Sequence, residues 1–201
     1  MKQLFLASLC ILAIACNQTP EKKAEKLIKD SIQKTLILPD SYQSVETIID
    51  SAYSPFSDPA FIDSVFDLFK KWGDLKECEV LVKKEKSMMS ILSSPMSSFG
   101  RSQYKQAKER YEEILEIYDK LNNRYQSVED KVHPRMFEAP SFIGYVVHHR
   151  YRSSDNDGDV QLTGRYYLLD SDMLSIKASW DEDQYNQYKE YLQQLIEASK
   201  D

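Results

Sequence analysis

The first regular pattern in the chain is a helical one that follows Thr19 and Pro20. Small and apolar side chains recur at helical spacing at Ala24, Leu27, Ile28, Ile32 and Leu36. A threonine followed by a proline is a typical helix start, and Pro39 cannot continue a helix. The pattern therefore predicts a helix over 20–36. The next segment, 42–53, is rich in β-branched residues and predicts a strand.

A seven-residue repeat occupies the middle of the chain. Its first half starts at Asp58-Pro59 and places apolar residues along one seam, at Phe61, Val65, Leu68, Trp72, Leu75, Val82 and Met89. Its second half alternates two sets, Tyr104, Tyr111, Tyr118 and Tyr125 with Ala107, Ile114, Leu121 and Val128. Pro95 and Gly100 predict a loop over 93–102 between the halves. The repeat predicts an antiparallel helical hairpin at about 59–130, with a kink or break at Gly73.

The tyrosine row of the second half allows two interpretations. Exposed rings at one heptad position could form a stacking platform for sugars or bases. A tyrosine at a seam position more often packs its ring and keeps its hydroxyl at the rim. We expect the packing arrangement.

The period changes to two after Pro140. Alternation over 142–152 predicts a strand, the polar segment 153–158 a turn, 160–169 a second strand and 174–180 a third. Ser179 to Glu182 has capping-box spacing and predicts a last helix with Tyr185, Tyr188, Leu192 and Leu195 on its apolar stripe. The fold class is therefore α+β: an antiparallel meander of three to four strands packed with N- and C-terminal helices, with an inserted long antiparallel helical hairpin.

The first sixteen residues differ from the rest. A basic residue, Lys2, precedes a short apolar run, and small residues precede Cys16. This pattern is typical of a secretory signal, and Ala13-Ile14-Ala15-Cys16 resembles a bacterial lipobox. The resemblance implies acylation of Cys16, and a plain signal cut without lipidation is the alternative. The expected organisation is a signal peptide over 1–15, a lipidated cysteine and tether over 16–23, and one α+β domain over 24–201.

Composition narrows the function classes. The 201 residues carry a formal net charge of -6, which disfavours sequence-independent nucleic-acid binding. Cys10 would leave with the signal and Cys16 would carry the anchor, so Cys78 alone remains in the body and no internal disulfide is expected. The sequence has no metal-ligand spacing, glycine-rich phosphate loop or nucleophile-base motif. It therefore predicts no metal site and no cofactor.

Two short segments carry a family resemblance. Lys34-Thr35-Leu36 with Pro39-Asp40-Ser41-Tyr42, and Phe142-Ile143-Gly144-Tyr145 with Val147, His149, Tyr151 and Arg152, resemble a group of small uncharacterised lipoproteins of Gram-negative anaerobes. The chain departs from that group at Leu38, where an aspartate is usual, and at Tyr145, where tryptophan is usual. The group has no established active site, so the resemblance implies none here.

The histidines and arginines of the 142–152 strand are the main candidate side chains. Strand alternation separates His148 from His149, so the two cannot bind one metal from a regular strand. His149 shares its face with apolar residues and is expected to be a half-buried packing histidine. The other face carries a candidate anion or partner-binding set made of His148, Arg150, Arg152 and, from the next strand, Arg165. The alternative is a solvated face paired with carboxylates.

The acidic turn after this strand invites a calcium interpretation. In the twelve-residue loop of the helix–loop–helix calcium motif, Gly158 would be the central glycine. Ser153 would then stand at position one, and Gly164 at position twelve, where a bidentate glutamate is needed. A hairpin turn therefore explains the residues better. Cys78 occupies a seam position and is expected to be a buried, inert thiol.

These observations favour a non-enzymatic envelope lipoprotein that binds a partner through its hairpin or its sheet face. Its lipid anchor would hold it to a bacterial membrane, on either the periplasmic or the surface side. The competing class is a cell-envelope enzyme acting on glycan or peptide, with carboxylates that only the fold brings together.

Overall fold

The computed structural model describes residues 19–93 and 98–200. The predicted signal peptide and Cys16 lie outside the described residues. The chain divides into two compact units, where the sequence suggested a single domain. Unit 1 takes the described residues up to Ser57 and Pro140–Asn186, and unit 2 takes Asp58–Ala139 and the chain from Gln187 onward.

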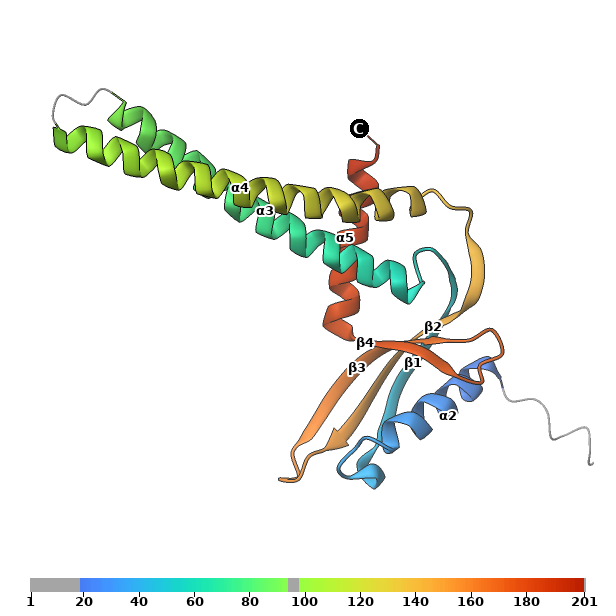
Figure 1. The fold of residues 1–201 in the computed structure, drawn as a ribbon. Coiled ribbons are helices and arrows are strands. Elements are labelled where there is room, and N and C mark those ends of the chain that lie inside the picture. Colours follow the sequence, from blue (N-terminus) through green and yellow to red (C-terminus); the bar gives the residue numbers. More distant parts are fainter. Residues whose placement is uncertain (1–18, 94–97, 201) are drawn as a thin grey trace, which may run out of the picture. The chain divides into compact units, whose positions relative to one another are not determined.

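Unit 1 is a four-stranded antiparallel sheet with one long helix on it. The strands β1 (Gln43–Ser54), β2 (Ser141–Ser154), β3 (Val160–Leu169) and β4 (Ile176–Asp181) lie side by side in chain order, as the α+β prediction requires. Helix α2 (Pro20–Gln33) lies along one face of this sheet (Figure 1). The core between them is apolar and consists of Ala24, Ile28, Ile32, Val147, Tyr151, Tyr167, Leu169 and Met173.

The start of α2 follows the sequence prediction. The Thr19 side chain accepts a hydrogen bond from the Lys22 backbone N–H at 3.5 Å, and Pro20 is the first helical residue. The helix ends at Gln33, three residues before the predicted end. A 3₁₀ turn, η1 (Pro39–Ser41), then leads into β1. The predicted tether is shorter than expected, because 20–23 already belongs to α2.

Unit 2 contains the predicted antiparallel hairpin, made of α3 (Pro59–Leu92) and α4 (Ser98–Arg135) (Figure 1). Asp58 caps α3 through its Oδ1, which accepts from the Ala60 N–H at 3.0 Å. Of the kink or break predicted at Gly73, the break is wrong, because α3 is helical throughout. A single glycine costs a helix only about 1 kcal/mol, and the buried Leu68 and Leu75 on either side offset it. The predicted loop is also too long, since α4 has begun by Ser98.

The hairpin seam matches the heptad prediction with one exception. Phe61, Val65, Leu68 and Leu75 of α3 are buried, as is Ala107 of α4, and the tyrosine row of α4 is half-buried as expected of packed rings. The other predicted seam residues are also half-buried: Val82, Met89, Ile114, Leu121 and Val128. Val132 of α4, outside the predicted set, is buried as well. Trp72, predicted in the seam, keeps 46% of its surface exposed. The heptad position alone did not reveal this exposure.

The C-terminal elements start later than predicted. Ser179 lies inside β4 and is not a helix cap, because α5 (Glu182–Ala198) follows β4 without a loop. Leu174, predicted to start the third strand, precedes β4 and is 69% exposed. The division between the two units falls inside α5, after Asn186.

Candidate functional site

The face of the sheet opposite α2 carries a stack of three rings. His148 of β2 pairs across the ladder with Tyr166 of β3, and their rings stack with centroids 4.4 Å apart and planes within 15°. Tyr185 from the first turn of α5 stacks on Tyr166 at 4.2 Å. Burial raises the pKa of Tyr185 to about 12, so this phenol stays protonated near neutral pH.

A carboxylate approaches the histidine of this stack. Glu182 Oε1 lies 3.0 Å from His148 Nε2. Among the described residues this nitrogen has no aligned hydrogen-bond partner, so the contact is a close approach of the two groups without a formed hydrogen bond. His148 is held by ring stacking on one side and by Glu182 on the other.

The two arginines of β2 are held less closely than His148. Arg150 Nη1 lies 4.0 Å from Glu46 Oε2, the limit of an ion pair, and its Nε has no hydrogen-bond partner among the described residues. Arg152, near the end of β2, is exposed. These side chains share the His148 face by strand alternation, as predicted.

Arg165 does not join them. The ladder pairs His149 with Arg165, and directly opposed residues of antiparallel strands point to the same face. Arg165 therefore lies on the α2 side of the sheet, where its Nη2 is 3.2 Å from Asp181 Oδ1. The four cationic residues do not converge on one site, and three of them already face a carboxylate. The expectation failed because the strand register cannot be read from the two strand sequences alone.

His149 is a structural histidine, and it is more deeply buried than the predicted half-buried residue. It is fully buried, with Nε2 2.8 Å from the Tyr42 hydroxyl and Nδ1 2.9 Å from Thr47 Oγ1. Either neutral tautomer satisfies both contacts, because a hydroxyl can donate or accept. Burial lowers the pKa of His149, with the Glu25 carboxylate opposing that shift. The neutral ring completes the α2-side core.

The acidic segment after β2 forms a hairpin turn. Asp155 Oδ1 accepts hydrogen bonds from the backbone N–H groups of Asp157 and Asp159, both at 3.0 Å, and Gly158 has φ of +86°. The Asp155 side chain and two backbone hydrogen bonds, from Asp155 to Asp159 and from Gly158 to Asp155, thus hold the turn, as the turn interpretation expects. Within residues 19–93 and 98–200, no three histidine, cysteine or acidic side chains gather as a metal site would need.

Cys78 also behaves as the sequence predicts. It is buried in the hairpin, with Sγ 3.9 Å from the Ile114 carbonyl oxygen. Burial raises the pKa of the thiol, which disfavours the reactive thiolate.

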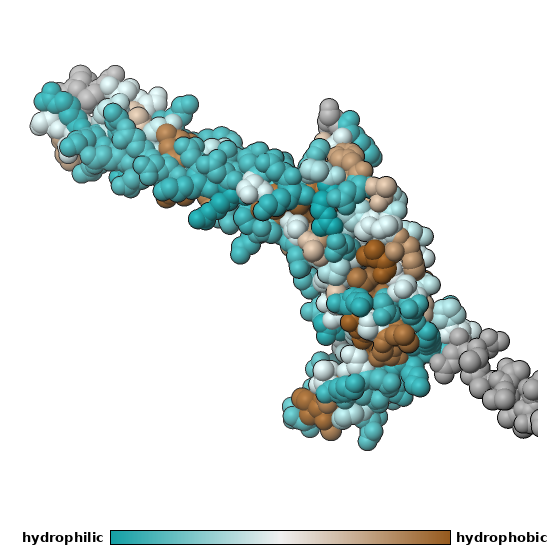
Figure 2. Space-filling view, turned by 45° about the vertical axis from the view of Figure 1, so that its right-hand side comes forward, coloured by the Kyte–Doolittle hydropathy of each residue, from teal (hydrophilic) through white to brown (hydrophobic). Residues whose placement is uncertain are grey.

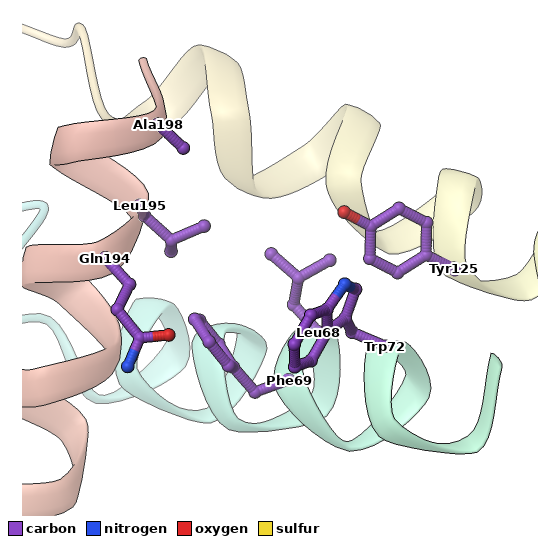
Figure 3. Close-up of a pocket in the computed structure, with 7 residues that line it drawn as sticks. All are labelled: Leu68, Phe69, Trp72, Tyr125, Gln194, Leu195 and Ala198. Carbon is purple, nitrogen blue, oxygen red and sulfur yellow. The ribbon is translucent and has the colours of Figure 1, made fainter. Parts of the chain in front are cut away.

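The sequence patterns did not predict a pocket in unit 2. A cavity of about 260 Å³ lies among the side chains of α3, α4 and the later turns of α5 (Figure 3). Seven residues line it: Leu68, Phe69, Trp72, Tyr125, Gln194, Leu195 and Ala198. Trp72 is the seam residue that proved exposed, and its exposed ring forms part of this wall.

Aromatic contacts fix the walls of the pocket. Phe69 stacks on Tyr191 of α5 with centroids 3.9 Å apart and planes within 2°, and Trp72 meets Phe69 edge-on at 6.3 Å. The polar groups of the lining are the Gln194 amide, the Trp72 indole N–H and the Tyr125 hydroxyl, which donates to Glu129 Oε1 at 2.9 Å. Burial, reinforced by Glu129, raises the pKa of Tyr125 to about 12. The lining therefore carries no charge near neutral pH.

No helix within the described part of the chain is long and apolar enough to span a membrane. Comparison with models of protein families, with curated protein sequences and with solved structures finds no match to this chain.

Proposed function

We propose that this protein is an envelope lipoprotein, anchored through Cys16, that acts as a binding module and takes an uncharged apolar group into the pocket of unit 2. The sequence of residues 1–16 supports the anchor, and the pocket supports the binding role. The pocket is the single observation that carries the proposal. Apolar concavities with a few polar groups are the usual form of ligand sites.

The lining defines the chemistry of the ligand. Phe69 and Trp72 present aromatic surfaces, while Leu68 and Leu195 supply aliphatic ones. Each favours an apolar partner, and a flat ring gains most from aromatic walls. Because the Tyr125 hydroxyl already donates to Glu129, its oxygen is left to accept a hydrogen bond. The Gln194 amide can both donate and accept, so the ligand is an aromatic or branched aliphatic group with a few uncharged polar atoms, either free or as a side chain of a partner protein.

A binding role fits this pocket better than the enzymatic alternative. Glycan hydrolysis uses two carboxyl groups within roughly 5 to 10 Å of each other at the reacting bond. No carboxylate is among the seven lining residues. Glu129 lies behind Tyr125 and is engaged by its hydroxyl.

The anchor is tested by a pair of cysteine variants. Cys16→Ala should abolish labelling by a fatty-acid probe and release the protein from the membrane fraction. Cys10→Ala is the matched control, because this cysteine belongs to the predicted signal peptide, and it should label like the wild type. A Cys16→Ala protein that still incorporates the probe would refute the anchor.

The pocket is tested with the uncharged dye N-phenylnaphthylamine, whose fluorescence rises in apolar sites. The wild-type chain should enhance the dye, and Trp72→Ser should weaken its binding about tenfold or more, because one aromatic wall is lost. Val80→Ser changes another exposed apolar residue of α3 outside the lining and should leave dye binding unchanged. Equal losses in both variants would show that the dye reports general surface apolarity, and the pocket proposal would fail.

A further inference from the structure

Charge is distributed unevenly along the hairpin. The distal segment of the hairpin, defined as residues 83–93 and 98–110, carries seven lysine and arginine residues and two glutamates, a formal net charge of +5. The whole chain carries -6, so the remaining residues carry -11. All seven cations are exposed: Lys83, Lys84, Lys86, Arg101, Lys105, Lys108 and Arg110. An acidic protein thus concentrates positive charge at one end of its hairpin.

The fold does not use several of these charges. Within the described residues, Lys84, Lys86 and Arg101 have no ion-pair partner. Arg101 lies in the first turn of α4, where the positive end of the helix dipole repels a cation. The last turn of α3, where a cation would be favoured, has none. Intramolecular stability therefore does not account for this concentration of charge.

Exposed apolar side chains accompany the cations. Ile91, in the last turn of α3, is 74% exposed, and Phe99, in the first turn of α4, is 71% exposed. They are the two most exposed large hydrophobic residues in the described chain. The face of the hairpin that Figure 2 shows is mainly hydrophilic, with small separate hydrophobic patches. These two residues lie in the last turn of α3 and the first turn of α4, and the unpaired cations flank them in the sequence.

We infer that the distal segment of the hairpin binds an anionic lipid surface. Lysine and arginine side chains would contact the headgroups, and Ile91 and Phe99 would enter the boundary between headgroups and acyl chains. A bilayer accepts apolar side chains in any register, so two isolated residues without a groove are sufficient. A second copy of the chain, with its acidic residues facing these cations, would need a continuous matching apolar face. The inference uses no residue of the pocket and does not depend on the proposed function.

Vesicle binding tests the electrostatic part. The chain from residue 17, which has no lipid anchor and contains every described residue, is sedimented with phosphatidylcholine vesicles with and without phosphatidylglycerol. Binding should require phosphatidylglycerol and should weaken as salt is added. The triple variant Lys84→Ser, Lys86→Ser, Arg101→Ser should bind roughly 100-fold more weakly, since each cation contributes about fivefold.

A matched triple variant controls for loss of total charge. Lys120, Arg124 and Lys131 are exposed residues of α4 outside the distal segment, and their replacement by serine removes the same three charges. This variant should bind anionic vesicles within a few-fold of the wild type. Equal losses in the two triple variants would overturn the assignment to the distal segment.

The contribution of Ile91 and Phe99 to membrane binding is tested separately. Phe99→Trp should give a blue-shifted emission on anionic vesicles, because the new indole enters the interface. The double variant Ile91→Ser, Phe99→Ser should lose most binding at high salt. Val160→Ser is the control, because Val160 is an exposed apolar residue of β3.

Absence of binding to anionic vesicles would refute the inference. Sedimentation equilibrium that showed a wild-type dimer broken by the distal triple variant would assign the segment to self-association instead.

Discussion

The carboxylate of Glu182 occupies the space that a side chain at position 164 would need. A Cβ atom placed on Gly164 would lie 1.9 Å from Glu182 Oε2. The same carboxylate reaches His148 through its other oxygen, at 3.0 Å. A strand position without a side chain therefore allows the first residue of α5 to contact the ring stack of β2 and β3.

Gly164→Ala should therefore destabilise the protein through Glu182. The new methyl group displaces the carboxylate and breaks its contact with His148, at a cost of about 1 kcal/mol in the free energy of unfolding. The control is the same substitution in a Glu182→Ala background, where the displaced group is absent. Urea denaturation of the four proteins should show that Gly164→Ala costs little or nothing once Glu182 is removed. A cost that persists in that background would mean that the backbone, not Glu182, requires the glycine.

Gly144→Ala should be far more damaging. Gly144 has φ of +142°, and an added Cβ would lie 2.0 Å from the Leu169 carbonyl oxygen. The φ angle of residue 144 and the Leu169 carbonyl group are both fixed by the sheet and cannot move aside as a flexible side chain does. We therefore expect the free energy of unfolding to fall by at least about 3 kcal/mol. Thermal unfolding monitored by circular dichroism measures this loss of stability. A loss as small as that of Gly164→Ala would contradict the geometry of this strand.

Burial of His149 predicts a loss of stability in mild acid. The folded-state pKa lies below the ordinary value of 6.5, so below about 6.5 the unfolded chain binds a proton that the folded chain excludes. Stability is thus fully present above that pH and falls by up to about 1.4 kcal/mol per unit below it. His149→Gln should be less stable at neutral pH, by about 1 to 3 kcal/mol, because Tyr42 and Thr47 lose partners.

The pH comparison separates His149 from the other titrating groups. Urea denaturation of both proteins across this range should show a shallower pH dependence for His149→Gln. Identical slopes would show that carboxylates or His148 carry the acid sensitivity.

The sequence predicted those features that depend on local periodicity and caps. Thr19 and Asp58 start their helices as expected, and the tyrosine row packs in the hairpin. Local signals also failed at Gly73, where no break occurs, and at Ser179, which lies inside β4. The failure at the candidate site involves a relationship between distant segments. The side of the sheet that Arg165 takes depends on the register of β3 against β2.

The pocket could not be predicted for the same reason. It requires Leu195 of α5 to approach Leu68 and Trp72, and no periodicity within one segment encodes that approach. The charge of the distal segment, by contrast, follows directly from counting its residues in the sequence. Its meaning depends on the hairpin, which brings 83–86 and 101–110 to one end of two paired helices and leaves Ile91 and Phe99 exposed.

The last prediction concerns Leu68, which serves both the hairpin seam and the pocket. It is only 3% exposed and also lines the cavity beside Trp72. Leu68→Ala should cost about 2 to 5 kcal/mol, because it removes buried methyl groups and enlarges a space that the aromatic walls cannot fill. Val80→Ala, at a residue of α3 that is 65% exposed, should change stability by less than about 0.5 kcal/mol.

Ligand binding distinguishes the two roles of Leu68. If the folded Leu68→Ala protein keeps its aromatic walls, its larger cavity should still take up N-phenylnaphthylamine, while its unfolding midpoint in urea falls. Trp72→Ser should show the opposite pattern, with weaker dye binding and a small change in stability, because Trp72 is already half exposed. A Leu68→Ala protein as stable as the wild type would mean that this residue does not belong to a packed seam, and the hairpin packing described for unit 2 would be wrong.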